Sequence, residues 1–196
     1  MEFLLFVVII GLGFFFVKKY NYLQVLSQKI KEARSNIYVV FKQKVAIVNK
    51  FSEVVNQYSD YEKVTHLTAS ENYTDMARET AQAVNSIHAL ANMYPELKAD
   101  RQYAIFLDNI SKNEVQLAER RERYNSVVNH YNSEIAKIPM VFVASVLGFK
   151  EAPYFDTENE SAIDSFSGAN TEAIKELALK GTEQIKEKFT QKSENK

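Results

Sequence analysis

The amino end of the chain is an uninterrupted apolar run. Residues 3–17 read FLLFVVIIGLGFFFV and contain no charged side chain. At 1.5 Å per helical residue this run is about 23 Å long, whereas the hydrocarbon core of a bilayer is about 30 Å thick. Met1 and the snorkelling side chains of Lys18 and Lys19 would complete the span. The sequence therefore predicts a single-pass transmembrane anchor over residues 1–19, with lipid-facing positions Phe3, Leu4, Leu5, Phe6, Val7, Val8, Ile9, Ile10, Gly11, Leu12, Gly13, Phe14, Phe15, Phe16 and Val17.

A cleaved signal peptide and a lipidated amino end both fit this apolar run less well than an anchor does. A cleaved signal peptide begins with basic residues and ends at small ones, but here Glu2 precedes the run and no A-x-A-like site follows it. A lipidated cysteine is excluded because the chain contains no cysteine. Five lysine and arginine residues follow the run between positions 18 and 34. The positive-inside rule therefore places the rest of the chain on the cytoplasmic side of the cell membrane.

The composition of the remaining chain indicates one ordinary domain. About 130 residues between the anchor and the tail are enough to bury a hydrophobic core. The formal net charge of −1 argues against nucleic acid as a partner, because phosphate binding needs a concentrated basic face. The absence of cysteine excludes disulfides and thiolate chemistry.

Long helices are indicated by the lack of helix breakers. Between Lys19 and Pro139 the chain has one proline, Pro95, and no glycine. Apolar residues recur at alternating three- and four-residue steps, which predicts helices over about 22–67, 73–94 and 100–138. We expect an all-α fold in which the anchor continues into a long antiparallel helical bundle over residues 20–150, with coiled-coil-like packing. Short connections would make the first and third helices parallel, with the second between them.

Three segments follow the bundle helices. The apolar run at residues 140–149 is too short to span a bilayer, so we expect it to cap the bundle. Residues 151–170 read as an exposed acidic linker, because five acidic and no basic residues lie between positions 151 and 164. An amphipathic tail helix is predicted over 171–190 and a disordered end over 191–196.

Two tyrosine–asparagine pairs lie seven residues apart on the third predicted helix, with the tyrosines on its seam, the row of positions that faces the core. Tyr124 and Tyr131 can bury ring area while their hydroxyls find partners, and Asn125 and Asn132 follow at the next position. We expect these residues to make packing and helix contacts rather than a ligand site.

Charged residues also occupy seam positions. Glu114 and Arg121 are seven residues apart, and they either pair and specify register or extend outward to water. Lys44 is the polar member of the first helix's seam, and we expect Glu96 or Asp100 as its partner.

Several motifs resemble the bacterial LemA family. They are YNYL at 20–23, ARSNI at 33–37, YPELKA at 94–99 and ERRERYNSVVNHYN at 119–132, followed by Pro139, Gly148, Phe149, Tyr154 and Phe155. The resemblance covers about residues 1–155 and implies a membrane-tethered antiparallel helical bundle in a family without an agreed enzymatic activity. Relatives commonly carry a proline where this chain reads AIVNKF at 46–51, so a straighter first helix is expected here. The family-motif positions, expected to be structural, are Tyr94, Pro95, Leu97, Lys98, Glu114, Arg121, Tyr124, Asn125, Tyr131 and Asn132.

The sequence offers no constellation for catalysis. A di-metal site in a helical bundle needs two Glu-x-x-His pairs, but His66, His88 and His130 are widely spaced and none follows a glutamate at that interval. Neither a Gly-rich phosphate loop nor a nucleophile elbow is present. We therefore predict no enzyme activity, no catalytic residue, no cofactor and no metal site.

The function predicted from the sequence is a non-enzymatic, membrane-tethered interaction or scaffold module of the bacterial cell envelope. Its expected partners are membrane lipid, through the anchor, and an envelope protein. The membrane-proximal heptads also allow a homo-oligomer, and nucleic acid is not expected. The alternative is a lipid- or small-ligand-binding protein that uses the apolar 140–149 segment or the tail helix.

Overall fold

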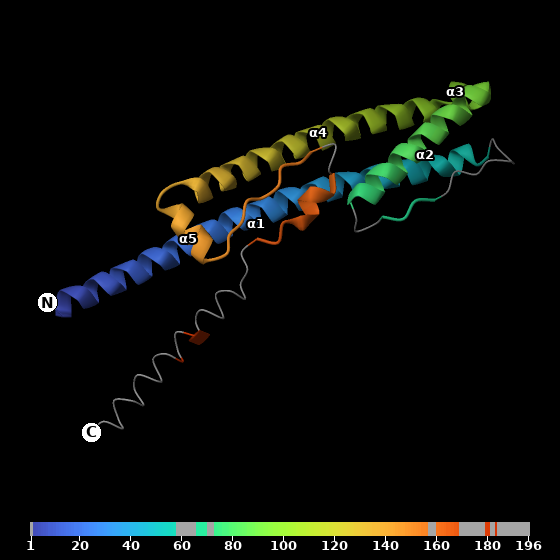
Figure 1. The fold of residues 1–196 in the computed structure, drawn as a ribbon. Helices are drawn as coiled ribbons and strands as arrows, with labels where there is room; N and C mark the ends of the chain where they lie inside the picture. The colour runs from blue at the N-terminus through green and yellow to red at the C-terminus, as the bar shows by residue number, and fades with distance from the viewer. Residues whose placement is uncertain are drawn as a thin grey trace. The chain divides into compact units, whose positions relative to one another are not determined.

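The computed structural model describes residues 2–57, 66–69, 73–156 and 160–168, together with residues 179, 180 and 183. These residues form helices and connecting segments and contain no strand, which confirms the all-α prediction. Most of the predicted tail helix over 171–190 and all of the segment 191–196 lie outside the described residues. The elements in Figure 1 are α1 (Glu2–Val55), α2 (Tyr73–Met93), α3 (Pro95–Ala99), α4 (Arg101–Ala136), α5 (Met140–Val146) and the 3₁₀ helix η1 (Glu160–Ser165).

Helix α1 joins the apolar N-terminal run to the first bundle seam in one 54-residue helix, unbroken through residues 46–51. The prediction that this helix reaches Leu67 is wrong. The side chain of Asn49 accepts a hydrogen bond from the Leu67 backbone N–H and donates one to its carbonyl, each at 2.8 Å. An unbroken helix would place Leu67 about 27 Å beyond Asn49, so the chain leaves the helix after Val55 and returns alongside it.

The chain divides into two compact units, and α1 and α4 contribute to both. Unit 1 comprises residues 1–29, 129–152 and 166–196, and unit 2 comprises residues 30–128 and 153–165.

In unit 2, α1 and α4 are antiparallel. The ring of Phe51 stacks on that of Phe106 with centroids 4.6 Å apart, whereas the carbonyl of Val40 accepts a hydrogen bond from Asn113 at 3.0 Å. The expected parallel arrangement of the first and third helices is therefore wrong. Its premise was a short connection between the first two helices, but Leu67 is hydrogen-bonded to Asn49 of α1, and α2 runs in the same direction as α1 (Figure 1). The buried core of this unit includes Val48, Phe51, Val55, Ala83, Ile87, Leu90, Ala91, Leu97, Tyr103 and Phe106.

In unit 1, α1 packs with the last turns of α4 and with α5. The rings of Tyr20 and Phe149 lie 5.7 Å apart, edge to face, and the Tyr22 side chain is hydrogen-bonded to Glu134. The buried apolar residues that these elements contribute are Leu23, Leu26, Tyr131, Ile135, Met140, Val143, Ala144 and Phe149.

Gly148 ends helix α5. Its φ of 72° lies in the left-handed region, which a side chain would disfavour. The Phe149 N–H donates to the Ala144 carbonyl at 2.9 Å, and the Gly148 N–H donates to that of Ser145 at 3.4 Å, which is a Schellman motif. This motif turns the chain so that Phe149 returns to Tyr20.

Candidate functional site

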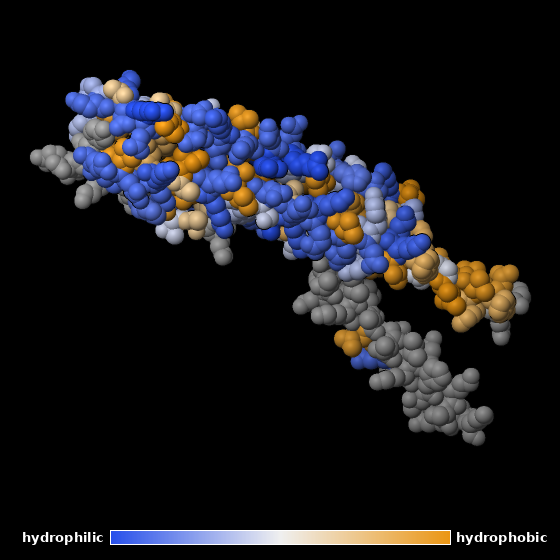
Figure 2. Space-filling view, turned by 180° about the vertical axis from the view of Figure 1, so that it is seen from behind, coloured by the Kyte–Doolittle hydropathy of each residue, from blue (hydrophilic) through white to orange (hydrophobic). Residues whose placement is uncertain are grey.

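Helix α1 is the one helix among the described residues that is long and apolar enough to cross a membrane. In the apolar run, the side chains described are exposed except for that of Phe15, which is half-buried. In Figure 2 this end of the chain is hydrophobic over the face in view. The burial changes at Leu23, from which point α1 contributes core residues at heptad spacing.

The pair Tyr124–Asn125 in unit 2 binds the backbone that follows α5. The Tyr124 hydroxyl donates to the carbonyl of Pro153 at 2.9 Å. The Asn125 amide oxygen accepts from the Phe155 N–H at 2.7 Å, and its Nδ2 donates to the Phe155 carbonyl at 3.3 Å. One asparagine thus satisfies both polar groups of one backbone residue, as a neighbouring β-strand would.

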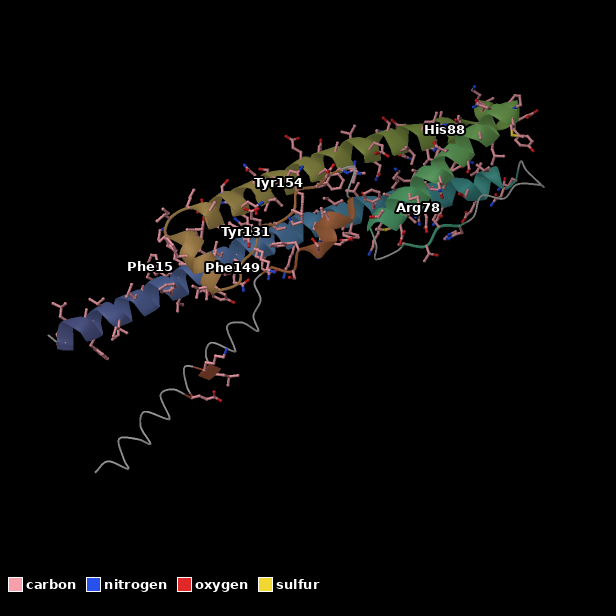
Figure 3. All side chains as sticks on the ribbon, viewed as in Figure 1. Phe15, Arg78, His88, Tyr131, Phe149 and Tyr154 are labelled. Atoms are coloured by element: carbon pink, nitrogen blue, oxygen red, sulfur yellow. The ribbon has the colours of Figure 1, made fainter. Side chains whose placement is uncertain are left out.

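The pair Tyr131–Asn132 in unit 1 repeats this arrangement. The Tyr131 hydroxyl donates to the carbonyl of Lys150 at 2.9 Å. The Asn132 side chain accepts from the Ala152 N–H at 2.8 Å and donates to the Ala152 carbonyl at 2.9 Å. We call residues 150–155 the strap; Tyr131 and Tyr154 are labelled in Figure 3.

The spacing of the two pairs matches the spacing of their partners. Seven helical residues rise about 10.5 Å, and three residues of extended chain span about 10 Å. Each pair can therefore contact the strap in the same way, three strap residues apart. This gives the seven-residue repeat of Tyr-Asn a structural reason.

Both tyrosines are fully buried, and burial raises the pKa of each hydroxyl to about 12. At Tyr124 the nearby Arg34 lowers the pKa and Asp164 raises it, each less than burial does. The hydroxyls therefore stay protonated at physiological pH and donate to strap carbonyls, which makes them unsuited to proton transfer at neutral pH.

The segment that follows α5 is not exposed throughout, contrary to expectation. Its apolar residues Ala152, Phe155, Ile163 and Phe166 are buried. In unit 1 the Phe166 ring lies 5.6 Å from that of Tyr131. In unit 2 the Ile163 carbonyl accepts from Arg34 at 3.0 Å. These apolar positions and the binding of backbone groups by helix side chains explain why an acidic composition did not keep the segment in solvent.

Lys44 pairs with Glu114, its ammonium nitrogen 2.6 Å from Oε1. The prediction of Glu96 or Asp100 as its partner is wrong, because α1 and α4 are antiparallel and bring the middle of α4 to Lys44. The exposed fraction is 9% for the Lys44 side chain and 48% for that of Glu114, so the carboxylate extends to the wet edge of the seam.

Arg121, on the same seam, lies against aromatic rings. Its guanidinium carbon is 4.5 Å from the centroid of Phe155 and 5.9 Å from that of Phe41. Cation–π contact of this kind holds the strap residue Phe155 on the bundle.

The motif YPELKA forms the corner between α2 and α4. Pro95 is the first residue of α3, where its missing N–H costs no hydrogen bond. Leu97 is fully buried in the core of unit 2, with Tyr94 packed against that core. Lys98 donates to Asn92 at 3.3 Å.

A groove between α1 and α4 in unit 2 is a feature that sequence reasoning missed. It encloses about 420 Å³, within the range of ligand-binding clefts. The stacked rings of Phe51 and Phe106 contribute to its wall. The seam pattern marked these two phenylalanines as core and gave no sign that they also line a groove. Its lining residues are Ala46, Ile47, Lys50, Phe51, Gln102, Ile105, Phe106 and Asn109.

The described residues contain no cluster of three or more histidine, cysteine, aspartate or glutamate side chains able to hold a metal ion. Nδ1 of His88 lies 2.9 Å from the Tyr103 hydroxyl, a hydrogen bond between α2 and α4 at the edge of the core.

Comparison with known proteins decides the family. Residues 33–165, well over half of the chain, match the sequence model of the LemA family. The chain belongs to the LemA family. The resemblance seen in the motifs is therefore confirmed, although the matched range begins later than residue 1 and extends past residue 155 to include η1.

Relatives of this LemA-family chain fall into two groups. Protein LemA of Metamycoplasma hominis is 25% identical over 175 residues, which are 82% of this chain and 80% of that protein. Magnetosome protein MamQ 2 of Paramagnetospirillum magneticum is 34% identical over 73 residues, and magnetosome protein MamQ of Magnetospirillum gryphiswaldense is 29% identical over 73 residues. These 73 residues are 37% of this chain, and they span only about a quarter of the MamQ proteins, 27% of their length. No solved structure is detectably similar to the chain.

Proposed function

We propose that this chain is a non-enzymatic, membrane-tethered helical scaffold of the bacterial envelope. The observation that carries the proposal is the exposure of apolar side chains along α1 before Lys18, where Phe15 is the one described side chain of the apolar run that is half-buried. Phe3, Leu4 and Phe14 are 81%, 72% and 63% exposed. A helix that is apolar on every face requires an apolar surrounding, and a bilayer supplies one.

The proposed location is the cell membrane, with the bundle on the cytoplasmic side. Lysine and arginine residues follow the apolar run, and the positive-inside rule counts such residues near the ends of a span. A single cysteine at the exposed position Gln116, in a chain that has no other, gives a direct test. In intact cells, a membrane-impermeant maleimide should leave this cysteine unlabelled until the membrane is permeabilised. Labelling of intact cells would place the bundle on the outer side.

The proposed partner surface is the groove between α1 and α4. A groove between two helices accepts a third helix that offers an apolar stripe. Phe51, Ile105 and Phe106 offer such a stripe a complementary surface, while Lys50 is the charged residue of the lining. The partner that fits is therefore an amphipathic helix of another envelope protein, with an acidic side chain for Lys50.

Site-specific photo-crosslinking tests the groove in cells. A photoreactive phenylalanine analogue replaces Ile105, which lines the groove and is 49% exposed; the control replaces Val115, which is 58% exposed and lies outside it. We expect a discrete crosslink to another protein from position 105 and none from position 115. Ile105→Glu should abolish co-purification of the same protein, whereas Val115→Glu should retain it.

Three results would reject the scaffold proposal in this form. A crosslink from position 105 to a second copy of the chain would identify a homo-oligomer. Equal crosslinking from both positions, or co-purification unaffected by Ile105→Glu, would mean that the groove does not select the partner.

A further inference from the structure

We propose that the outward face of α5 is a second membrane contact, inserted into the lipid interface beside the anchor. This inference rests on the proposed membrane tethering and adds a surface that the anchor does not include. The face consists of Val141, Phe142 and Val146 of α5 together with Ile138 of the turn before it, and we call it the α5 apolar face.

The α5 apolar face is unusually exposed for its composition. Ile138 is 80%, Phe142 65%, Val146 58% and Val141 39% exposed, while the inward residues Met140, Val143 and Ala144 are buried. Helix α5 is therefore apolar on both sides, with Ser145 as its one polar residue. A short helix packed on a water-soluble bundle would be expected to carry polar residues on its outer side.

The contacts of unit 1 place this face at the level of the anchor's end. Tyr22 of α1 is hydrogen-bonded to Glu134 of α4, and later in the chain Phe149 contacts Tyr20, so the chain advances toward the amino end of α1. Helix α4 continues from Glu134 to its last residue, Ala136, which advances the chain about 3 Å toward the amino end of α1. The turn that contains Ile138 therefore lies near the level of Tyr20, the residue that Phe149 contacts after α5.

The thickness of a bilayer places the same level at the membrane surface. A hydrocarbon core of about 30 Å corresponds to about twenty helical residues, from Met1 to Tyr20. The headgroup region adds roughly 5–7 Å on each side. The α5 apolar face, near the level of Tyr20, thus falls at the boundary between acyl chains and headgroups.

Burial along α1 agrees with this placement. Phe15, Lys19 and Tyr20 are half-buried, whereas Phe14, Phe16 and Val17 are exposed. One side of the anchor's end is therefore already covered, and Figure 3 labels Phe15 and Phe149 on this part of unit 1. The exposed side of the anchor and the adjoining α5 apolar face can both be covered by the lipid of one membrane leaflet.

Tryptophan fluorescence tests the proposal in the full-length protein, because the chain has no tryptophan of its own. Three single-tryptophan variants, Phe142→Trp, Phe16→Trp and His130→Trp, are reconstituted into phosphatidylcholine–phosphatidylglycerol vesicles. Brominated acyl chains and aqueous acrylamide serve as the two quenchers. His130 is exposed on α4 in the same unit, two turns before the helix ends, and serves as the aqueous control.

We expect Phe142→Trp to show blue-shifted emission, loss of intensity with brominated lipid and shielding from acrylamide. Phe16→Trp should behave in the same way, and His130→Trp should show the opposite pattern. If Phe16→Trp is quenched by lipid but Phe142→Trp is open to acrylamide, the anchor stands and the α5 contact is refuted.

Two further outcomes would also overturn the inference. A Phe142→Trp signal shielded from both lipid and acrylamide would mean that protein, such as a second copy, covers the face. If lipid quenches neither Phe16→Trp nor Phe142→Trp, the proposed membrane tethering fails together with the contact that depends on it.

Discussion

The strap gives the sharpest quantitative test of the structure, at Asn132. Its side chain makes two hydrogen bonds to Ala152, which is 3% exposed. Each such bond contributes about 1 kcal/mol, and a buried backbone group left without a partner costs about 1–3 kcal/mol. Asn132→Ala should therefore weaken the closed strap by about 2–4 kcal/mol. Since 1.4 kcal/mol is a factor of ten, the Ala152 amide should exchange with solvent about 30-fold to 1000-fold faster.

Native-state hydrogen exchange of the full-length protein in detergent micelles measures this directly. Gln116→Ala is the matched control, because Gln116 is an exposed residue of the same helix, and it should leave exchange at Ala152 unchanged. If Asn132→Ala changes the Ala152 exchange rate by less than about threefold, the strap is held by burial of its apolar side chains and the hydrogen-bond argument is refuted.

Asn132→Asp separates the two hydrogen bonds. The carboxylate can still accept from the Ala152 N–H, but it cannot donate to the Ala152 carbonyl. One of its oxygens would instead lie about as close to that carbonyl oxygen as the asparagine nitrogen does, at 2.9 Å. A protonated carboxyl can donate again, so the folded state should favour protonation and raise the pKa of this aspartate above its usual value of about 3.9. Stability should accordingly be regained as pH falls through that raised pKa. Unfolding curves without such recovery would argue against the donor's role.

Three further predictions follow from burial and pairing. Above a pH of about 10 a tyrosine in the unfolded chain ionises, whereas Tyr131 in the folded protein, with its pKa of about 12, stays neutral. The free energy of unfolding should therefore fall by about 1.4 kcal/mol per pH unit because of this group. In alkaline denaturation, Tyr131→Phe should show a shallower fall than the unsubstituted protein, whereas the exposed control Tyr154→Phe should not. A double-mutant cycle on Lys44 and Glu114 should give a coupling free energy of about 1 kcal/mol or less, because the carboxylate is half exposed; a value several times larger would contradict this. Leu97→Ala should lower the free energy of unfolding by about 2–5 kcal/mol in urea titrations, and a loss below 1 kcal/mol would mean that this fully buried site is not part of the core.

The helices that the sequence predicts well are those with a long, regular apolar pattern. The predicted ranges 73–94 and 100–138 agree with α2 and α4 to within a few residues at each end. The pattern is strong there because each helix buries one stripe against its neighbours over many turns.

The prediction of helix direction was wrong for a different reason. The parallel arrangement of the first and third helices was inferred from loop length, and loop length was inferred from the end of the first helix. The helix ends at Val55, and Leu67 returns to Asn49 through a polar contact that leaves no trace in apolar periodicity. The partner predicted for Lys44 was wrong as a direct consequence, because direction determines which part of α4 the lysine meets.

The strap contacts could have been predicted only in part. Side chains that bind backbone groups place no constraint on the identity of the strap residue, so a sequence cannot pair Asn132 with Ala152. It does, however, contain a numerical relation: Tyr-Asn recurs after seven residues, and apolar residues recur after three at Ala152 and Phe155. Because seven helical residues and three extended residues cover nearly the same length, the two intervals are the pattern expected when an extended segment runs along a helix. The acidic composition of residues 151–164 was the signal used for the prediction, and it pointed to solvent, whereas Ala152, Phe155 and Ile163 within that segment are buried.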